Sequence, residues 1–264
     1  MANRPRAAVI LAAGMGTRLK NVFSDRPKGF VEIGGEGLIH RSVRLLQERG
    51  IERIVIVSGH MGSAYEALAA ELAGLEVVEN AEFATTGSMA SLARALEEVN
   101  EDFLLLESDL FYEERALDVL LEDEAPDILL ASGPTGATDE VWIEASDGCL
   151  RGMSKDPAEL GEVYGELVGI VRISHPLAQA MARAYARFVD ENGHGQMAYE
   201  TDALVEAAGE RPVALRLVPD LLWGEVDYEH HYLRVRDEVW PRWASGQVAA
   251  PSSSPSSREL GAQK

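Results

Sequence analysis

A short apolar run, Ala7–Leu11, leads directly into a loop with glycines at positions 14 and 16, and this junction constrains the fold more than any other part of the chain. A bounded apolar run of this length predicts a buried strand. Glycines placed after a strand let backbone N–H groups approach an anion closely. Arg18 can grip phosphate oxygens with two N–H groups, and Lys28 adds a compact charge. The sequence therefore predicts an α/β fold whose first loop holds phosphate.

The loop matches neither of the two common phosphate-binding patterns. It lacks the third glycine of G-x-G-x-x-G, and the Walker pattern G-x-x-x-x-G-K-[ST] is absent. The segment Leu11–Arg18 reads L-A-A-G-M-G-T-R, and Pro27-Lys28 follows about ten residues later. This pattern resembles the nucleotidyltransferases that make nucleoside diphosphate sugars and related activated compounds. The resemblance implies that Arg18 and Lys28 act in catalysis and that the nucleotide contacts Leu11, Ala12, Ala13, Gly14, Gly16 and Thr17.

Composition excludes several other classes of protein. The chain has 264 residues, of which 46% are hydrophobic, so it can bury one large α/β core. Its formal net charge of −20 repels the phosphates of DNA and RNA, so we expect no nucleic-acid partner. Against this acidic background, a local basic cluster suits a small anionic ligand. The cluster consists of Arg18, Lys20, Arg26 and Lys28.

The cysteine count and the apolar segments bear on the compartment. Cys149 is the only cysteine, which excludes an intrachain disulfide and a cysteine-based zinc site. No stretch approaches the roughly 18 apolar residues of a membrane span, and the N-terminal apolar run belongs to the first strand rather than to a secretory signal. We therefore expect a cytoplasmic protein without a membrane partner, and we leave a homodimer open as its assembly.

Strand and helix patterns alternate through the first half of the chain. After residues 7–11, strands are expected at 54–58, 75–78 and 103–107, and helices at 38–49, 64–72, 88–99 and 113–122. This order predicts a Rossmann-like α/β fold, with a mixed, mainly parallel sheet flanked by helices. Ligands in such sheets bind beyond the carboxyl ends of the strands. The loops after the first, third and fourth of these strands are therefore the candidate site.

The second half predicts a different arrangement. Closely spaced strands are expected at 128–132, 141–145, 150–154, 167–173, 213–218 and 222–226, with helices at 175–190, 199–208 and 228–240. We expect this small subregion to cover the sheet and hold the second substrate. Residues 1–243 then form the nucleotidyltransferase domain. The tail, 244–264, is rich in serine and proline and cannot bury a core, so we expect it to be disordered.

Two aspartates follow predicted strands and are candidate metal ligands. Asp109 comes directly after residues 103–108, and Asp227 after residues 223–226. Magnesium prefers hard carboxylate oxygens, and aspartates at these two places bind the metal in the family that the sequence resembles. The resemblance therefore implies Mg²⁺ held by Asp109 and Asp227. Each could instead cap the helix that follows it. Glu225 lies two residues from Asp227 and could help the metal or be a structural partner.

The segment between residues 79 and 92 follows a predicted strand, continues as an irregular loop and begins a helix. In the family that the sequence resembles, the comparable loop closes on the base and ribose. Gly87 and Ser88 are small enough to permit a close approach, and Asn80, Thr86 and Ser88 can read the edge of a pyrimidine. We therefore predict that Asn80, Thr86, Gly87 and Ser88 bind the nucleotide, with helix capping alone as the alternative role for Ser88.

Three further segments indicate a branch of the family. The segments 85–92, 107–113 and 139–142 resemble the small cytidylyltransferases that activate phosphonates, such as 2-aminoethylphosphonate, and phosphocholine. Within that branch, residues 108–112 and 139–141 are most similar to the phosphonate enzymes. The resemblance covers roughly residues 6–240. It implies that CTP is the nucleotide and that the acceptor is a small phosphonate or phosphate ester.

The acceptor site is predicted from charged and aromatic residues in the second half. A lysine at the position of Lys155 faces the acceptor phosphate in relatives, and its alternative here is a solvated turn residue. An aromatic cage would suit a quaternary ammonium, whereas carboxylates would suit a primary ammonium. Both kinds of residue are present. The predicted acceptor-binding residues are Tyr112, Trp142, Glu200 and Asp202, with each aromatic residue also a candidate for the core.

These residues together predict a cytidylyltransferase. An acceptor phosphonate oxygen would attack the α-phosphorus of CTP and release pyrophosphate, with no covalent enzyme intermediate and no general base. The alternatives are phosphocholine or a sugar 1-phosphate as acceptor, or a nucleotide-binding regulatory module without catalysis. The joint presence of Arg18, Lys28, Asp109 and Asp227 speaks against the last of these.

Overall fold

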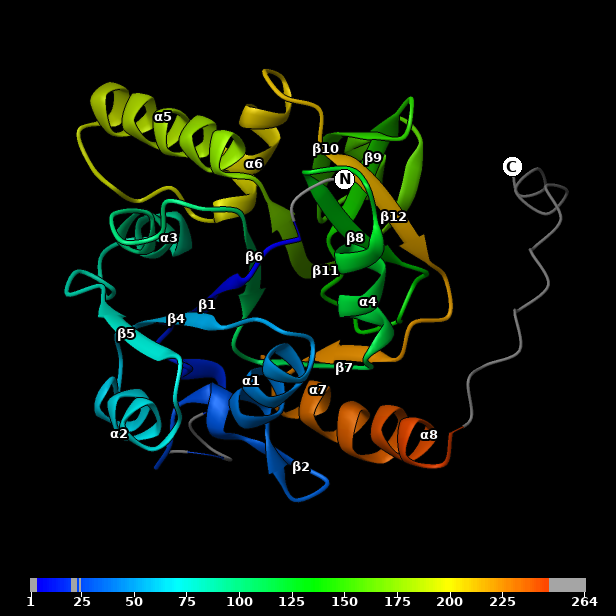
Figure 1. Cartoon of the computed structure of the whole chain (residues 1–264). Coiled ribbons are helices and arrows are strands. Elements are labelled where there is room, and N and C mark those ends of the chain that lie inside the picture. Colours follow the sequence, from blue (N-terminus) through cyan, green and yellow to red (C-terminus); the bar gives the residue numbers. More distant parts are fainter. Residues whose placement is uncertain (1–3, 20–22, 24, 247–264) are drawn as a thin grey trace, which may run out of the picture.

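A nine-stranded sheet lies at the centre of the protein. The structure, a computed structural model, describes residues 4–19, 23 and 25–246 (Figure 1). The strand order is β5-β4-β1-β6-β11-β8-β12-β10-β9. These strands span Ala7–Ala12 (β1), Arg53–Ser58 (β4), Leu75–Glu79 (β5), Phe103–Glu107 (β6), Ile128–Ser132 (β8), Trp142–Ser146 (β9), Cys149–Ser154 (β10), Val163–Ile173 (β11) and Ala214–Val218 (β12).

The first half of the sheet is parallel, as the alternating pattern predicts. Strand β1 pairs in parallel with β4 and with β6, and β4 pairs in parallel with β5. The register places Leu11 of β1 opposite both Val57 and Glu107. The loops after β1 and β6 therefore emerge side by side at the same edge, and this brings the glycine loop next to Asp109.

Helices cover both faces of the sheet, which confirms the predicted α/β class. Figure 1 shows α3, α5 and α6 on one side and α1 and α2 on the other. Their apolar side chains form two large core clusters, one on each face. The helices span Leu38–Glu48 (α1), Ser63–Glu71 (α2), Ser88–Leu96 (α3), Arg115–Glu122 (α4), His175–Asn192 (α5) and Glu200–Ala208 (α6). Among the described residues, no helix is long and apolar enough to cross a membrane.

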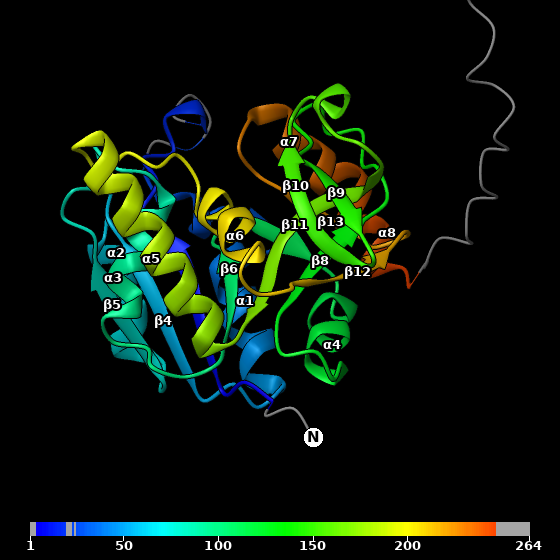
Figure 2. The ribbon, with the colours of Figure 1, turned by 90° about the horizontal axis from the view of Figure 1, so that it is seen from above.

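The second half of the sheet is mixed. Strand β11 runs antiparallel to β6 and β8, while β12 is parallel to β8. A register shift in β11 falls between Leu167 and Val171, and Gly169 within it has a φ of +79°. Figure 2 shows β8, β9 and β10 grouped at the opposite end from β4 and β5. The fold thus presents a parallel region and a mixed region that meet at β6 and β11.

Two small sheets were not expected from the sequence. Strand β2 (Glu32–Ile33) pairs with β3 (Glu36–Gly37), and β7 (Leu110–Tyr112) pairs with β13 (Trp223–Glu225). The pairing of β7 with β13 brings the chain after Asp109 next to the chain before Asp227. Two residues more than 100 positions apart in sequence therefore reach the same place.

The C-terminal helix differs from the prediction of one helix over 228–240. It is α-helical over Glu229–Arg234 (α7), π-helical over Val235–Val239 and α-helical again over Trp240–Ala244 (α8). Pro241 has no N–H to donate into the preceding turn, which opposes a regular α-helix there. Ala244, predicted as the first tail residue, ends α8; from residue 247 the tail lies outside the described residues.

Candidate active site

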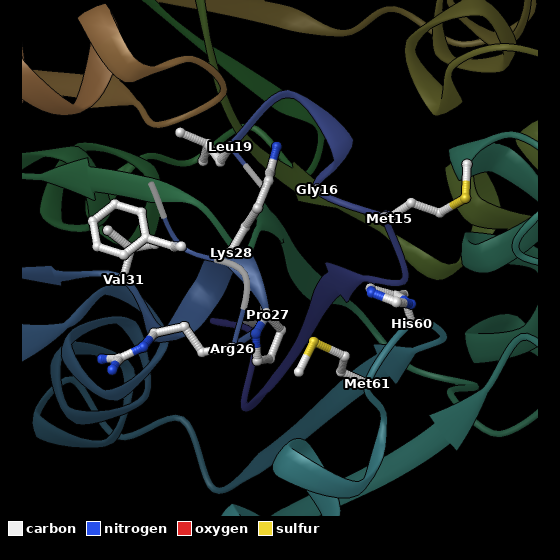
Figure 3. A pocket seen from close by; sticks show the side chains of 11 residues that line it. Met15, Gly16, Leu19, Arg26, Pro27, Lys28, Val31, His60 and Met61 are labelled. Carbon is white, nitrogen blue, oxygen red and sulfur yellow. The ribbon is translucent and has the colours of Figure 1, made fainter. Parts of the chain in front are cut away.

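Lys28 is held at the centre of the site by a tight local structure. It opens a 3₁₀-helix, Lys28–Phe30, after the extended Pro27. Gly16 has a φ of +57°, and a Cβ built there would lie 3.1 Å from the Lys28 Cγ. Figure 3 shows the Lys28 side chain running past Gly16 and Leu19. Gly16 therefore shapes the path of Lys28, since another residue would need a strained backbone and a shift of the lysine.

The Lys28 ammonium pairs with the carboxylates of both predicted metal ligands. Its Nζ contacts Asp109 and Asp227, and the Arg18 guanidinium lies 2.6 Å from Asp227. Burial would lower the pKa of Lys28, but the charges of Asp109 and Asp227 outweigh it and raise this pKa. Because one nitrogen touches both carboxylates, Asp109 and Asp227 are close enough to share a cation.

Three carboxylates gather beside this ion pair. One oxygen each from Glu107, Asp109 and Glu225 lies within 4.8 Å of the others. Burial, with the charges of Asp109 and Asp227, raises the pKa of Glu225 to about 8, and burial with the charge of Glu225 raises the pKa of Glu107 well above its ordinary value. A divalent cation would stabilise all these groups in their ionised form. The oxygen-only donor set fits Mg²⁺, which the family typically uses.

Glu107 was not among the predicted ligands. It ends β6 two residues before Asp109, and alternate residues of a strand point to the same face. The spacing of two residues between Glu107 and Asp109 could therefore have indicated, from the sequence alone, that both side chains lie at the same site. Glu225 stands in the same relation to Asp227 at the end of β13. The site therefore has two pairs of acidic residues, each at the end of a strand.

A cavity of about 260 Å³ opens beyond the carboxyl end of β1. Its lining includes Tyr65 and Phe83 from the neighbouring elements. Several predicted nucleotide-binding residues line it: Leu11, Ala12, Ala13, Gly14, Thr86, Gly87 and Ser88. Gly16 and Thr17 are not among the described lining residues; Gly16 borders the adjoining small pocket of Figure 3, and Thr17 begins a short 3₁₀-helix.

Asn80 supports this cavity from behind rather than lining it. It is 3% exposed, and its amide donates to Ser91 Oγ at 3.0 Å and to Thr86 Oγ1 at 3.2 Å. Gly87 leaves no room for a side chain, because a Cβ there would lie 1.8 Å from the Met197 carbonyl oxygen. The loop between β5 and α3, predicted to bind the base, is thus fixed by Asn80 within its own segment and by close backbone packing against the segment before α6.

A second cavity, of about 530 Å³, lies between the mixed part of the sheet and helices α6 and α7. Lys155 and Asp202 line it, as predicted for the acceptor site. Lys155 Nζ lies 2.6 Å from Asp139, another lining residue, and the Asp202 carboxylate accepts a hydrogen bond from the Tyr199 backbone at 3.1 Å. Trp142 is not among the described lining residues, although it is in register with Ser154 and Glu166, which are.

The structure corrects two of the predicted acceptor contacts. Tyr112 is 0% exposed and packs in the core cluster shared by α1 and α4, because β7 pairs with β13 and draws it inward. The Glu200 carboxylate accepts from the Ser88 hydroxyl, and the Glu200 backbone N–H donates to Ser88 Oγ at 3.0 Å. Glu200 therefore contacts the start of α3 and ties α6 to it, and it is not among the described lining residues of the larger cavity.

Several other residues that line the larger cavity were not predicted from the sequence to belong to the acceptor site. Gly169, in the irregular part of β11, leaves space beside Glu107, since a Cβ there would lie 3.5 Å from the Glu107 carboxylate. Glu166, His231 and Arg234 line the cavity from β11 and α7. No local pattern marks them, because they meet only through the pairing of distant elements.

The two cavities meet at the charged cluster. Glu107, Tyr199, Glu225 and Asp227 line both of them. A ligand in each cavity would therefore present its reacting end to the same carboxylates and to Lys28. This arrangement can bring two anionic molecules together, because fixed cations and a metal would offset their repulsion.

Comparisons with known proteins agree with this geometry. The chain is 30% identical over 244 residues to CMP-5'-(3-aminopropyl)phosphonate synthase of Streptomyces rubellomurinus, covering 84% of this chain and 37% of that protein. It is 24% identical over 195 residues to 2-aminoethylphosphonate cytidylyltransferase of Lancefieldella rimae, covering 73% and 77% of the two chains. The chain thus spans well under half the length of the Streptomyces relative.

The fold also matches a solved structure. CTP:phosphocholine cytidylyltransferase from Streptococcus pneumoniae superposes with a TM-score of 0.73 at 20% identity, covering 89% of this chain and 99% of that one. The sequence model of the MobA-like NTP transferase domain matches residues 8–196, which is most of the described chain. The chain belongs to the MobA-like NTP transferase domain family.

Proposed function

We propose that this protein transfers CMP from CTP to a small phosphonate, with release of pyrophosphate. The observation that carries the proposal is the meeting of the two cavities at Glu107, Glu225 and Asp227, where Asp227 is paired with Lys28. The names of the two relatives described above supply the nucleotide and the acceptor class, because both concern CMP-linked or cytidylylated aminoalkylphosphonates.

The chain's own residues supply position and charge. CTP would lie in the smaller cavity, with its phosphates against the backbone of the glycine loop and against Lys28. Arg18 lines the larger cavity and is paired with Asp227, so it would meet the phosphates where the two cavities join. The acceptor would lie in the larger cavity, with its phosphonate near Lys155. Holding the two in line for attack on the α-phosphorus replaces a bimolecular encounter with a positioned one. The phosphonate already carries nucleophilic oxygens, so no side chain needs to act as a general base.

Asp109 and Asp227, with Glu107 and Glu225 beside them, would hold Mg²⁺. When bound, the metal would neutralise charge on the triphosphate and on the departing pyrophosphate. The residues fit this role through their chemistry, because each offers hard oxygen atoms. Lys28 remains within reach of the same carboxylates and supplies the fixed positive charge.

The larger cavity favours a polar head group over phosphocholine. Its described aromatic lining residues are Tyr199 and Trp223, and the Trp223 Nε1 donates to Ser132 Oγ at 2.8 Å. The acidic residues Asp139, Glu140 and Glu166 line the same cavity. A primary ammonium can hydrogen-bond with carboxylates, whereas a trimethylated one cannot.

The test is pyrophosphate release by the purified full chain with CTP, Mg²⁺ and single acceptors: 2-aminoethylphosphonate, 2-hydroxyethylphosphonate, phosphocholine and glucose 1-phosphate. We expect turnover with the phosphonates, a CMP-linked product by mass spectrometry, and a preference for CTP over UTP and ATP. Reactions without acceptor are the control. A phosphocholine kcat/KM tenfold above both phosphonates would reassign the acceptor, and equal rates with the three nucleotides would remove the cytosine preference.

A further inference from the structure

Arg234 lines the larger cavity from α7 and is not used by the reaction described above. The carboxylates whose charges act on it are Glu166, Glu238 and Glu140, not those that surround Lys28. The Arg234 guanidinium packs over Gly224 of β13, where a Cβ would lie 2.7 Å from its Nη2, and it forms no ion pair with the carboxylates that hold Lys28. A molecule that reaches from Lys28 to Arg234 must have a functional group at each end.

Arg234 differs from the other permanent cations that line this cavity. Arg18 is paired with Asp227 and Lys155 with Asp139, each at 2.6 Å. Within the described part of the chain, the Arg234 guanidinium has no ion-pair or hydrogen-bond partner, and its Nε is buried without one. The nearby carboxylates therefore act on Arg234 only from beyond ion-pair distance, and a ligand anion in the cavity could form the direct contact that they do not.

His231, one turn earlier on α7, does not share this role. Its Nε2 lies 3.2 Å from the Ala137 carbonyl oxygen, and burial together with His230 lowers its pKa. The ring is therefore neutral near neutral pH and adds no positive charge. Arg234 is the cation that would meet an anionic group at this end.

Carboxylates surround the place where such an anion would lie. Glu166 is 2% exposed and accepts hydrogen bonds from the Thr135 backbone at 2.6 Å and its hydroxyl at 2.8 Å, and Glu140 lines the cavity nearby. A ligand anion alone would be attracted by Arg234 and repelled by these two groups. A ligand that also carries an ammonium beside its anion would pair with both signs of charge.

We propose that the acceptor is a phosphonate whose far end bears an ammonium and a carboxylate on the same carbon. Arg234 binds the carboxylate and determines specificity, while Glu166 and Glu140 receive the ammonium. The proposal rests on the function proposed above and narrows its acceptor. It concerns binding only, and the phosphonate end reacts as already described.

Two matched pairs of acceptors test this inference. 2-Amino-3-phosphonopropionate is 2-aminoethylphosphonate with a carboxylate on the amine-bearing carbon, and 2-amino-4-phosphonobutyrate stands in the same relation to 3-aminopropylphosphonate. Pyrophosphate release with CTP and Mg²⁺ gives kcat/KM for all four. We expect the carboxylated member of at least one pair to exceed its partner by about tenfold or more, as a charge-assisted hydrogen bond would provide.

The variant Arg234→Gln should lower that within-pair ratio by about tenfold or more, mainly through KM for the carboxylated acceptor. Arg236→Gln is the matched control, because Arg236 is an exposed residue of the same C-terminal helical segment paired with Asp237 at the surface. Thermal unfolding of both variants confirms that they fold. An Arg234→Gln protein that does not fold is replaced by Arg234→Lys, which keeps the charge but not the two-pronged hydrogen bonding and should lower the ratio too.

The outcomes separate the two proposals. If the acceptors without a carboxylate react as fast as or faster than their partners, or if Arg234→Gln leaves the ratio unchanged, the inference about Arg234 is wrong and the proposed function stands. If neither these four phosphonates nor 2-hydroxyethylphosphonate supports pyrophosphate release with CTP, the proposed function is wrong, and the inference that rests on it is wrong with it.

Discussion

The smaller cavity, proposed as the nucleotide cavity, and the larger one, proposed as the acceptor cavity, meet at the same carboxylates but are built in different ways. The nucleotide cavity follows the carboxyl ends of parallel strands, and most of its lining comes from residues before position 110. The acceptor cavity is assembled from β10, β11, β13, α6 and α7, with a register shift at Gly169. One half is thus a local loop motif, and the other depends on long-range pairing.

The difference indicates where each kind of specificity lies. The nucleotide half contains the glycine loop and other small residues, whose backbone we propose holds the triphosphate. The acceptor half contains charged side chains of both signs, such as the cations Lys155 and Arg234 and the carboxylate Glu166. These side chains have different partners. Changes in the first half should therefore affect turnover, whereas changes in the second should affect the choice and affinity of the acceptor.

The largest effect is expected for Asp109→Asn, since Asp109 belongs to the charged cluster beside which the two cavities meet. It contacts Lys28 and belongs to the carboxylate cluster, so its loss should lower kcat by about 10³-fold or more with Mg²⁺ present. Pyrophosphate release at saturating CTP and acceptor measures this. Asp237→Asn, at an exposed surface pair, is the control. A kcat within tenfold of wild type would remove Asp109 from the reacting centre.

Lys28→Ala tests the nucleotide half. We expect kcat to fall by about 10²-fold, because a positive charge at the transferring phosphoryl group typically supplies several kcal/mol. The acceptor KM should change much less than kcat, which steady-state kinetics with each substrate varied in turn would show. A variant that keeps near wild-type turnover but loses acceptor affinity would reverse the assignment of Lys28 to this half.

Lys155→Ala is the corresponding test of the acceptor half. The Lys155 side chain is 53% exposed and its ammonium is paired with Asp139, so its contribution is screened and smaller. We expect the acceptor KM to rise by about tenfold, with the CTP KM within a factor of about two, from a single charge-assisted contact. The same rise in both KM values would mean that the two cavities are not functionally separate.

The two halves also differ in how far the sequence predicts them. The segment from Leu11 to Gly14 could be placed at a site beyond the end of β1, where it lines the smaller cavity, because a strand, a tight loop and its glycines are adjacent in the chain. Tyr112 and Glu200 could not be placed correctly. Their orientation depends on β7 pairing with β13 and on the contact of α6 with α3, which link segments about 110 residues apart. Local sequence patterns do not show which distant strand or helix a segment will pack against.

The smallest effect is expected for Tyr112→Phe, which tests that correction. Tyr112 is fully buried among the residues of α1 and α4, so removal of its hydroxyl should leave the acceptor KM within about twofold of wild type. The free energy of unfolding should change by about 1 kcal/mol or less, the usual effect of one buried hydroxyl, as measured by urea denaturation. Tyr199→Phe, at an aromatic residue that lines both cavities, provides the comparison. A tenfold rise in acceptor KM for Tyr112→Phe, with unchanged stability, would return Tyr112 to the acceptor site and would mean that the acceptor cavity extends into the core between β7 and α1.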